Sequence, residues 1–237
     1  MRLDKLFSDM GLLSRKACAQ AVRRAQITVD GVVVRSASVH VDPAVQVIAY
    51  GGERVVYETF TYVLLNKPAG YVSATDDPLL PYVTELLPEV LRRRELFPAG
   101  RLDRDTVGLM LLTNDGRLAH DLLSPRHHVE KVYRFTCERA LDPSCEERFL
   151  SGITIGDYAC KSAVLVADAD RMGGELTLTE GKYHQVKRML EAVDNRVSSL
   201  ERIRFGPLTL DPTLPRGAWR YLTDAEREAI TAYRRGT

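Results

Sequence analysis

The sequence predicts an α+β protein in two parts, a small amino-terminal α/β module over residues 1–58 and a larger domain over residues 59–237. The larger domain is expected to be built on a mixed, largely antiparallel sheet. The amino-terminal module has its own apolar pattern and hairpin signal. A polar stretch over residues 51–59, which starts with two glycines, has the composition of a linker. Beyond it, short strands and helices alternate irregularly, which favours an α+β domain over a regular βαβ fold.

The amino-terminal module is predicted to contain two helices, a hairpin and a further strand. Apolar residues at helical spacing over residues 3–10 predict the first helix, and Gly11 ends it. Ser14 can cap the second helix. Asp30-Gly31 between two β-branched runs predicts a tight hairpin, because both turn residues need a positive φ. Residues 45–48 supply the further strand.

The larger domain is predicted to hold five strands and four helices. The strands are expected over residues 62–66, 108–113, 131–138, 162–167 and 175–179. Three helices are expected over residues 118–123, 143–150 and 184–193. A capping-box sequence, Thr223-Asp224-Ala225-Glu226, begins the last helix.

Composition excludes several classes of protein. Of the 237 residues, 45% are hydrophobic and 27% are charged, which is ordinary for a globular protein with a sizeable core. No apolar run approaches the roughly 18 residues that a membrane span needs. The first residues lack an apolar stretch of signal-peptide type. We therefore expect a cytoplasmic protein without a membrane partner.

The cysteines and histidines show no metal-binding pattern. The four cysteines contain no CxxC pair and no spacing typical of zinc ligands, so reduced thiols are expected. His127 and His128 are adjacent, and on a strand they would point to opposite faces. The sequence therefore predicts no metal site.

Charge is distributed unevenly along the chain. The net charge is only +1, but residues 1–35 contain seven Lys and Arg against three Asp, a local balance of +4. Such a cluster either binds the phosphates of a nucleic acid or is simply a solvated basic face, and charge alone does not decide between them.

Four segments combine polar residues with apolar flanks: residues 65–71, 100–109, 126–133 and 180–190. The first, on its own, reads as an ordinary turn after a strand, and the third as a solvated edge strand. The second places Asp103, Asp105 and two arginines close together, and without further information an ion-pair staple is favoured over a functional site. In the fourth, basic residues begin a helix, although they oppose its dipole. Such a local conflict is more typical of a functional site.

Taken in order, these segments resemble the RsuA branch of the pseudouridine synthases, which modify small-subunit ribosomal RNA. The first module is similar to an S4-type RNA-binding domain. The family's motifs are matched by residues 65–71, 100–116, 131–133 and 180–189, and residues 71–78 and 124–128 favour this branch over the large-subunit branches. Two departures stand out. Residues 152–163 form a shorter loop than usual, so an RNA contact there is expected to be missing. Lys187 stands where more distant relatives have Arg, and a lysine cannot form the bidentate fork with a carboxylate.

The resemblance implies a cofactor-free isomerisation of uridine to pseudouridine. The N1–C1′ bond is cleaved, the base rotates, and it is rejoined through C5, with no redox change. Asp103 is implied as the catalytic carboxylate, acting as nucleophile or base near C1′ or C2′. Lys187 would pair with it, and Tyr133 would lie against the target base and assist proton transfer. Asp105 is expected to be structural, bonding the turn at residues 106–108.

The same reasoning suggests residues that contact RNA. In the larger domain they are Arg101, Lys67, Lys131, Lys182, His184, Gln185 and Arg188, and in the first module Arg15, Lys16, Arg23 and Arg24. The expected partner is 16S ribosomal RNA or a small-subunit assembly intermediate, bound by a monomer.

Three alternatives remain at the level of the sequence. The first is a large-subunit (23S) synthase of the same family. The second is a non-enzymatic RNA-binding or ribosome-assembly protein, in which Asp103 is a staple and Tyr133 a half-buried strand residue. The third is a glycosidase acting on sugars, which would need a second carboxylate about 5–9 Å from the first. The motifs offer only Glu130 and Glu180, at their edges, for that role.

Overall fold

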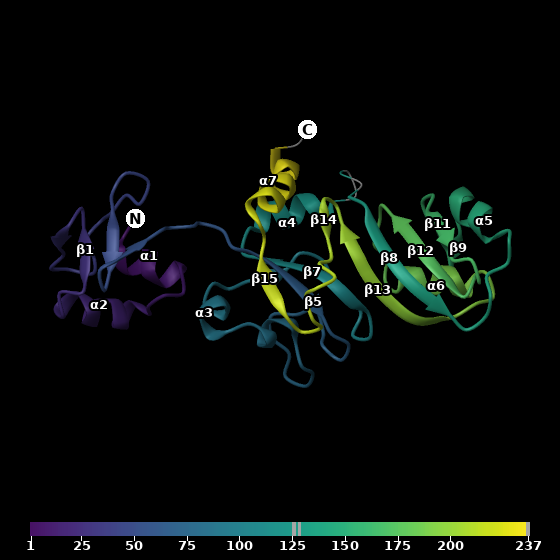
Figure 1. The fold of residues 1–237 in the computed structure, drawn as a ribbon, viewed down its shortest axis with the longest axis horizontal. Helices are drawn as coiled ribbons and strands as arrows, with labels where there is room; N and C mark the ends of the chain where they lie inside the picture. The colour runs from purple at the N-terminus through teal and green to yellow at the C-terminus, as the bar shows by residue number, and fades with distance from the viewer. Residues whose placement is uncertain (125–126, 128, 236–237) are drawn as a thin grey trace. The chain divides into compact units, whose positions relative to one another are not determined.

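The computed structural model describes residues 1–124, 127 and 129–235, which form two compact units (Figure 1). The first unit comprises Met1–Thr61 together with Leu87–Leu96, and the second Tyr62–Leu86 together with the chain from Phe97 onward. The sequence predicted a single boundary after residue 58 and did not predict that the segment 87–96 groups with the first unit. Within that unit, the Arg94 guanidinium donates to the Glu58 carbonyl over 2.5 Å.

The first unit contains the two predicted helices on a four-stranded sheet of order β2-β1-β3-β4. Its elements are α1 (Leu3–Asp9), α2 (Arg15–Arg23), β1 (Ile27–Val29), β2 (Val32–Val33), β3 (Ile48–Tyr50) and β4 (Glu53–Val55). The Ser14 hydroxyl caps α2 by accepting from the Ala17 amide. Asp30 and Gly31 have φ of 53° and 80°, which confirms the predicted hairpin turn. Apolar side chains from both helices and from the sheet form one buried core.

Two predictions in this unit were wrong. The strand expected over residues 45–48 begins only at Ile48, because Asp42 holds the preceding residues in a turn through the amides of Ala44 and Gln46. The stretch expected to be a linker starts with a hairpin. Gly51 and Gly52 both have a positive φ and connect β3 to β4.

The second unit is built on a nine-stranded sheet of order β11-β12-β8-β13-β7-β5-β15, with β14 paired to β13 and β6 to β7 (Figure 1). Among the strands of this sheet that the structure describes, only β13 and β7 pair in parallel, so the predicted mixed, largely antiparallel sheet is confirmed. The strands are β5 (Tyr62–Lys67), β6 (Phe97–Pro98), β7 (Val107–Thr113), β8 (Lys131–Cys137), β11 (Val164–Ala167), β12 (Gly173–Leu178), β13 (Val197–Phe205), β14 (Leu208–Thr209) and β15 (Trp219–Tyr221). A separate hairpin comprises β9 (Thr154–Ile155) and β10 (Tyr158–Ala159).

Helices lie at both ends of this sheet. They are α4 (Gly116–Leu123), α5 (Cys145–Ser151), α6 (Gln185–Glu191) and α7 (Asp224–Thr231), with 3-10 turns at Val83–Leu86 and Ala232–Arg235, whereas α3 (Glu89–Arg92) belongs to the segment that groups with the first unit. Figure 1 shows α5 and α6 beside the β8–β12 half, and α4 and α7 beside the β5–β15 half. The capping box at Thr223 is present. Each strand and helix predicted for the larger domain is found, with ends shifted by up to two residues.

The start of β7 positions the loop that carries Asp103. Gly108 has a φ of 101°, and a Cβ there would clash with the carbonyl oxygen of Arg202 on β13. Glycine therefore permits the close parallel approach of β7 and β13 at this point. None of the helices in the described part of the chain is long and apolar enough to cross a membrane. All four cysteines are buried free thiols.

Candidate active site

Lys67 fixes the loop that carries Asp103. It is the last residue of β5, and its side chain is fully buried. Its ammonium group donates to the carbonyl oxygens of Pro68, Asp103, Arg104 and Thr106 over 2.8–3.2 Å. Burial lowers the pKa of Lys67 to about 8, against the opposing effect of Asp105 and Asp103. The prediction that Lys67 contacts RNA was therefore wrong, because the side chain is enclosed by the loop that it holds.

Replacing Lys67 with Met is expected to destabilise the fold by about 2–4 kcal/mol, because four backbone carbonyls lose a charged donor. The pKa of Lys67 is lower in the folded chain, about 8 against the ordinary 10.5, so the unfolded chain binds more protons between these values. Wild-type stability should rise relative to the variant as the pH rises through this window. Urea unfolding at pH 7 and 10 measures both effects. Lys131→Met is the control, with a smaller loss expected since Lys131 donates to a single carbonyl, that of Val129; equal losses would contradict this account.

Lys187 binds both carboxylates of the loop. Its Nζ lies 3.1 Å from Oδ2 of Asp103 and 2.6 Å from Oδ1 of Asp105. Burial disfavours the charge on Lys187, but hydrogen bonds to Asp105 and Asp103 outweigh it and raise its pKa. Burial likewise disfavours the charge on Asp105, yet the hydrogen bond from Lys187 lowers the pKa of that carboxyl. The predicted pairing of Lys187 with Asp103 is present.

The role expected for Asp105 was different. Its carboxylate is 74% exposed and is bound to Lys187. The turn that it was expected to hold is closed instead by the Thr106 amide, which donates to the Asp103 carbonyl over 3.2 Å. The sequence showed that both carboxylates belong to one loop, but it did not show that they share a cation.

His184 approaches Asp103 from the other side of its carboxylate. Its Nε2 lies 3.6 Å from Oδ1 of Asp103, whereas Lys187 contacts Oδ2. His184 directly precedes α6 and has a left-handed backbone, with φ of 51° and ψ of 33°. Such a conformation is uncommon for residues other than glycine and occurs often at functional sites. The structure thus brings Asp103, Lys187 and His184 together.

Tyr133 lies on β8 and is nearly buried. In register with it on β13 is Arg202, a fully buried arginine that the sequence analysis did not single out. Its Nε donates to the Leu109 carbonyl over 2.8 Å, and its guanidinium lies 4.9 Å from the centre of the Phe205 ring. Burial lowers the pKa of Arg202, and Tyr133 acts in the opposite direction. Tyr133 is therefore close to a buried cation rather than in an apolar setting.

Comparison with known proteins identifies the family. Residues 61–192 match the family model described as RNA pseudouridylate synthase, and residues 1–47 match the S4 domain. The chain is a member of the RNA pseudouridylate synthase family. The synthase is 41% identical to ribosomal small subunit pseudouridine synthase A of Escherichia coli, over 97% of this chain and 100% of that protein. It is 43% identical to an uncharacterized RNA pseudouridine synthase of Bacillus subtilis, over 95% and 96% of the two chains.

A solved structure supports the same assignment. A crystal structure of a pseudouridylate synthase superimposes on this synthase with a TM-score of 0.69 at 36% identity, covering 97% of this chain and 99% of that one. The match extends over both units, so the resemblance found in the sequence is confirmed. Of the residues expected to favour the small-subunit branch, Pro125, Arg126 and His128 lie outside the described residues.

Two further residues expected to contact RNA are structural in this synthase. Lys131 is buried beside Phe205, and burial lowers its pKa to about 8, aided by Arg202 and opposed by Glu180. Gln185 is also buried. Its amide donates to Glu180 over 2.5 Å, and its Oε1 accepts from the backbone of Lys182. Both predictions were wrong, because these polar side chains satisfy the protein's own groups.

The other basic residues expected to contact RNA are partly or fully exposed to solvent. Arg188 is partly buried and donates to the Ile155 carbonyl over 3.2 Å, so it supports the β9–β10 hairpin that residues 152–163 form. Arg101 and Lys182 are exposed in the larger unit, and Arg15, Lys16, Arg23 and Arg24 are exposed on and after α2. Their contact with RNA remains a proposal.

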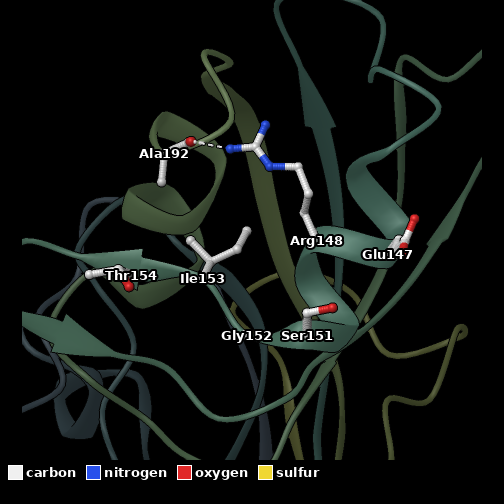
Figure 2. A pocket seen from close by; sticks show the side chains of 7 residues that line it. All are labelled: Glu147, Arg148, Ser151, Gly152, Ile153, Thr154 and Ala192. Atoms are coloured by element: carbon white, nitrogen blue, oxygen red, sulfur yellow. Dashed lines mark hydrogen bonds between the residues drawn. The ribbon is translucent and has the colours of Figure 1, made fainter.

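A cavity of about 470 Å³ lies apart from these residues (Figure 2). It is lined by Glu147, Arg148, Ser151, Gly152, Ile153, Thr154 and Ala192. The Arg148 guanidinium donates to the Ala192 carbonyl over 2.9 Å, as the dashed line in Figure 2 shows. Because none of the motif residues lines it, this cavity is not the candidate active site. The described residues also contain no cluster of three or more His, Cys, Asp or Glu suited to a metal ion.

Proposed function

We propose that this synthase isomerises one uridine of small-subunit (16S) ribosomal RNA to pseudouridine, with Asp103 as the catalytic carboxylate and no cofactor. The observation that carries the proposal is the placement of Asp103. Lys67 fixes its loop by donating to backbone carbonyls, and its two carboxylate oxygens face Lys187 and His184. Asp103 is partly exposed and its Oδ2 lies 3.1 Å from the Lys187 ammonium, so the carboxylate is accessible to a substrate and paired with a cation. The Escherichia coli and Yersinia pestis relatives, both named small-subunit synthases, support the choice of RNA.

The chemistry needs a carboxylate and a closed cage. Asp103 acts at C1′ or C2′ of the target nucleotide, the N1–C1′ bond breaks, and the uracil rotates. C5 then bonds to C1′, C5 loses its proton, and N1 ends protonated, so no atom is gained or lost. Holding both fragments in one site makes the second bond formation effectively unimolecular, with an effective molarity of about 10⁵ M or more for good alignment.

Tyr133 is proposed to lie against the detached base and to assist the proton transfer. The buried Arg202 is its register partner on β13 and places a cation beside Tyr133. The target nucleotide must leave its stack to reach such a site, at a cost of a few kcal/mol. Phosphate contacts from the exposed basic residues of the first unit offset this cost and position the RNA. We expect the enzyme to act as a monomer on ribosomal RNA or an assembly intermediate in the cytoplasm.

The deciding experiment maps pseudouridine in ribosomal RNA from cells that lack this protein. One site in small-subunit RNA should be lost and should return with the wild-type gene. Loss of a site in large-subunit RNA would assign the enzyme to the alternative branch of the family. An unchanged map would favour a non-enzymatic role in ribosome assembly.

The basic residues on α2 give a separate prediction. Replacing Arg15, Lys16, Arg23 and Arg24 with Gln should weaken RNA binding and flatten its salt dependence. Each lost phosphate contact lowers the slope of log K against log [salt] by about 0.7–0.9, and we expect roughly two to four lost contacts. Turnover at saturating RNA should change less than turnover at limiting RNA. Titrations at several salt concentrations measure the slope, and identical slopes would show that the cluster is only a solvated face.

A further inference from the structure

Tyr183 has an unusual position for a tyrosine. Its side chain is 76% exposed, and it lies directly before His184 and α6. The Tyr183 and His184 rings are stacked, with centroids 3.8 Å apart and planes inclined by 18°. His184 covers one face of the Tyr183 ring, so the exposed area includes the opposite face. Burial in the fold therefore does not account for this ring.

The stacked pair is held on a fixed turn. Glu180 accepts from the Tyr158 hydroxyl, from the backbone of Lys161 and from the Gln185 amide. Gln185 in turn accepts from the backbone of Lys182. These hydrogen bonds tie the residues on either side of the pair to one another and to the β10 segment. A surface held in this way loses little conformational entropy when a ligand binds to it.

One member of the stacked pair, His184, lies next to the candidate catalytic carboxylate of Asp103. His184 is 3.6 Å from Asp103 and stacks on Tyr183, so the rings extend outward from the place where the target uridine reacts. A cation accompanies them, because Lys182 lies on the same turn with its Nζ 4.3 Å from the centre of the Tyr158 ring. Aromatic faces next to basic side chains are the pattern by which proteins hold unpaired nucleotides.

We propose that Tyr183, supported by His184, stacks on the base of a nucleotide adjacent to the target uridine. The inference rests on the proposed function, since it takes Asp103 as the reacting group. When the target leaves its stack, a neighbouring base loses a partner. The open face of Tyr183 replaces that partner. Because every base has a π-face, this contact favours an unpaired flanking nucleotide without reading its identity.

The first test compares Tyr183→Leu with Tyr183→Phe on an RNA fragment that contains the mapped target. Leu removes the aromatic face and should lower kcat/KM by about five- to 150-fold, the effect of losing one base-stacking ring. The loss should lie mainly in KM, because the flanking base is stacked both before and during the reaction. Phe keeps the face and should stay within about twofold of the wild type. The matched control is Tyr221→Leu, a tyrosine on β15 that is 53% exposed and is expected to leave kcat/KM unchanged.

The second test observes stacking directly. A fluorescent base, 2-aminopurine, is placed on either side of the target in the same fragment and bound to Asp103→Asn enzyme, which prevents turnover. At one of the two positions, quenching should be strong with Asp103→Asn alone and with Asp103→Asn combined with Tyr183→Phe. It should be weaker with Asp103→Asn combined with Tyr183→Leu.

Three results would contradict these expectations in different ways. Unchanged kcat/KM and quenching in Tyr183→Leu, with Asp103→Asn still inactive, would overturn the stacking proposal and leave the proposed function intact. A loss with Tyr183→Phe equal to that with Tyr183→Leu would also overturn it, since the hydroxyl rather than the face would then be responsible. Activity of Asp103→Asn would instead contradict the proposed function.

Discussion

Asp103→Asn is expected to abolish pseudouridine formation, with kcat lower by about 10³-fold or more, while RNA affinity stays within a few fold of the wild type. The substitution is nearly isosteric, but it removes the charge and the attacking oxygen. The loop should keep its shape, because the Lys67 ammonium binds backbone carbonyls rather than the Asp103 carboxylate. Affinity should persist because it depends mostly on phosphate contacts.

Asp105→Asn is the matched control for this prediction. Both carboxylates belong to the same loop and bind the same Lys187, over 3.1 Å for Asp103 and 2.6 Å for Asp105. If the pair with Lys187 served only to staple the loop, the two variants would behave alike. We expect Asp105→Asn to retain most of its activity. Tritium release from the C5 position of labelled uridine measures both, and Asp103→Asn activity within tenfold of the wild type would contradict its catalytic role.

Local sequence signals predicted the features that depend on neighbouring residues. The Ser14 cap, the Asp30-Gly31 turn and the Thr223 capping box are each decided by backbone hydrogen bonds or dihedral angles within four residues. The pairing of Asp103 with Lys187 was reached in a different way. It came from matching two motifs separated by more than 80 positions in the sequence, which no local pattern could have joined.

Whether a long polar side chain is buried or faces solvent could not be predicted in this way. Lys67 and Lys131 were assigned to RNA because both belong to motifs and carry charge, yet both turn inward to backbone carbonyls. Lys67 is the last residue of β5, all six residues of which are buried, and the apolar run at residues 63–65 was the sequence signal for such a strand. A strand enclosed on both faces leaves no route to solvent for its last side chain.

The central strand β13 was missed for a related reason. Its apolar residues are interrupted by the polar pairs Ser198-Ser199 and Glu201-Arg202, so regular alternation is lost and the signal of a strand is weak. Arg202 is nevertheless buried, where its Nε donates to the Leu109 carbonyl and its guanidinium lies over the Phe205 ring. Only the neighbouring strands β8 and β7 reveal that this position is interior. The burial of Arg202 opposite Tyr133 could therefore not be predicted from the sequence.

Lys187→Met is expected to lower kcat by about 10²-fold or more, because Asp103 loses the cation that faces one of its oxygens. Lys187→Arg should recover much of this loss, since a guanidinium keeps the charge and can bind a carboxylate through two donors. The two variants separate the effect of charge from the effect of side-chain length. Activity of Lys187→Met close to that of the wild type would show that Lys187 does not support the reaction.

The same substitution has a stability effect with a defined pH dependence. The pKa of Asp105 is lowered in the folded enzyme, so its contribution is complete above the ordinary value of 3.8 and is lost as the pH falls through the folded value. The pKa of Lys187 is raised, so its contribution is complete below 10.5 and is lost as the pH rises through the folded value. The wild type should therefore exceed Lys187→Met by about 1–2 kcal/mol near neutral pH, less than a buried pair gives because Asp105 is exposed. Denaturant unfolding at acidic, neutral and alkaline pH should show this difference shrinking at both extremes. A difference that is the same at every pH would mean that Lys187 stabilises the loop by packing its methylene groups rather than by its charge.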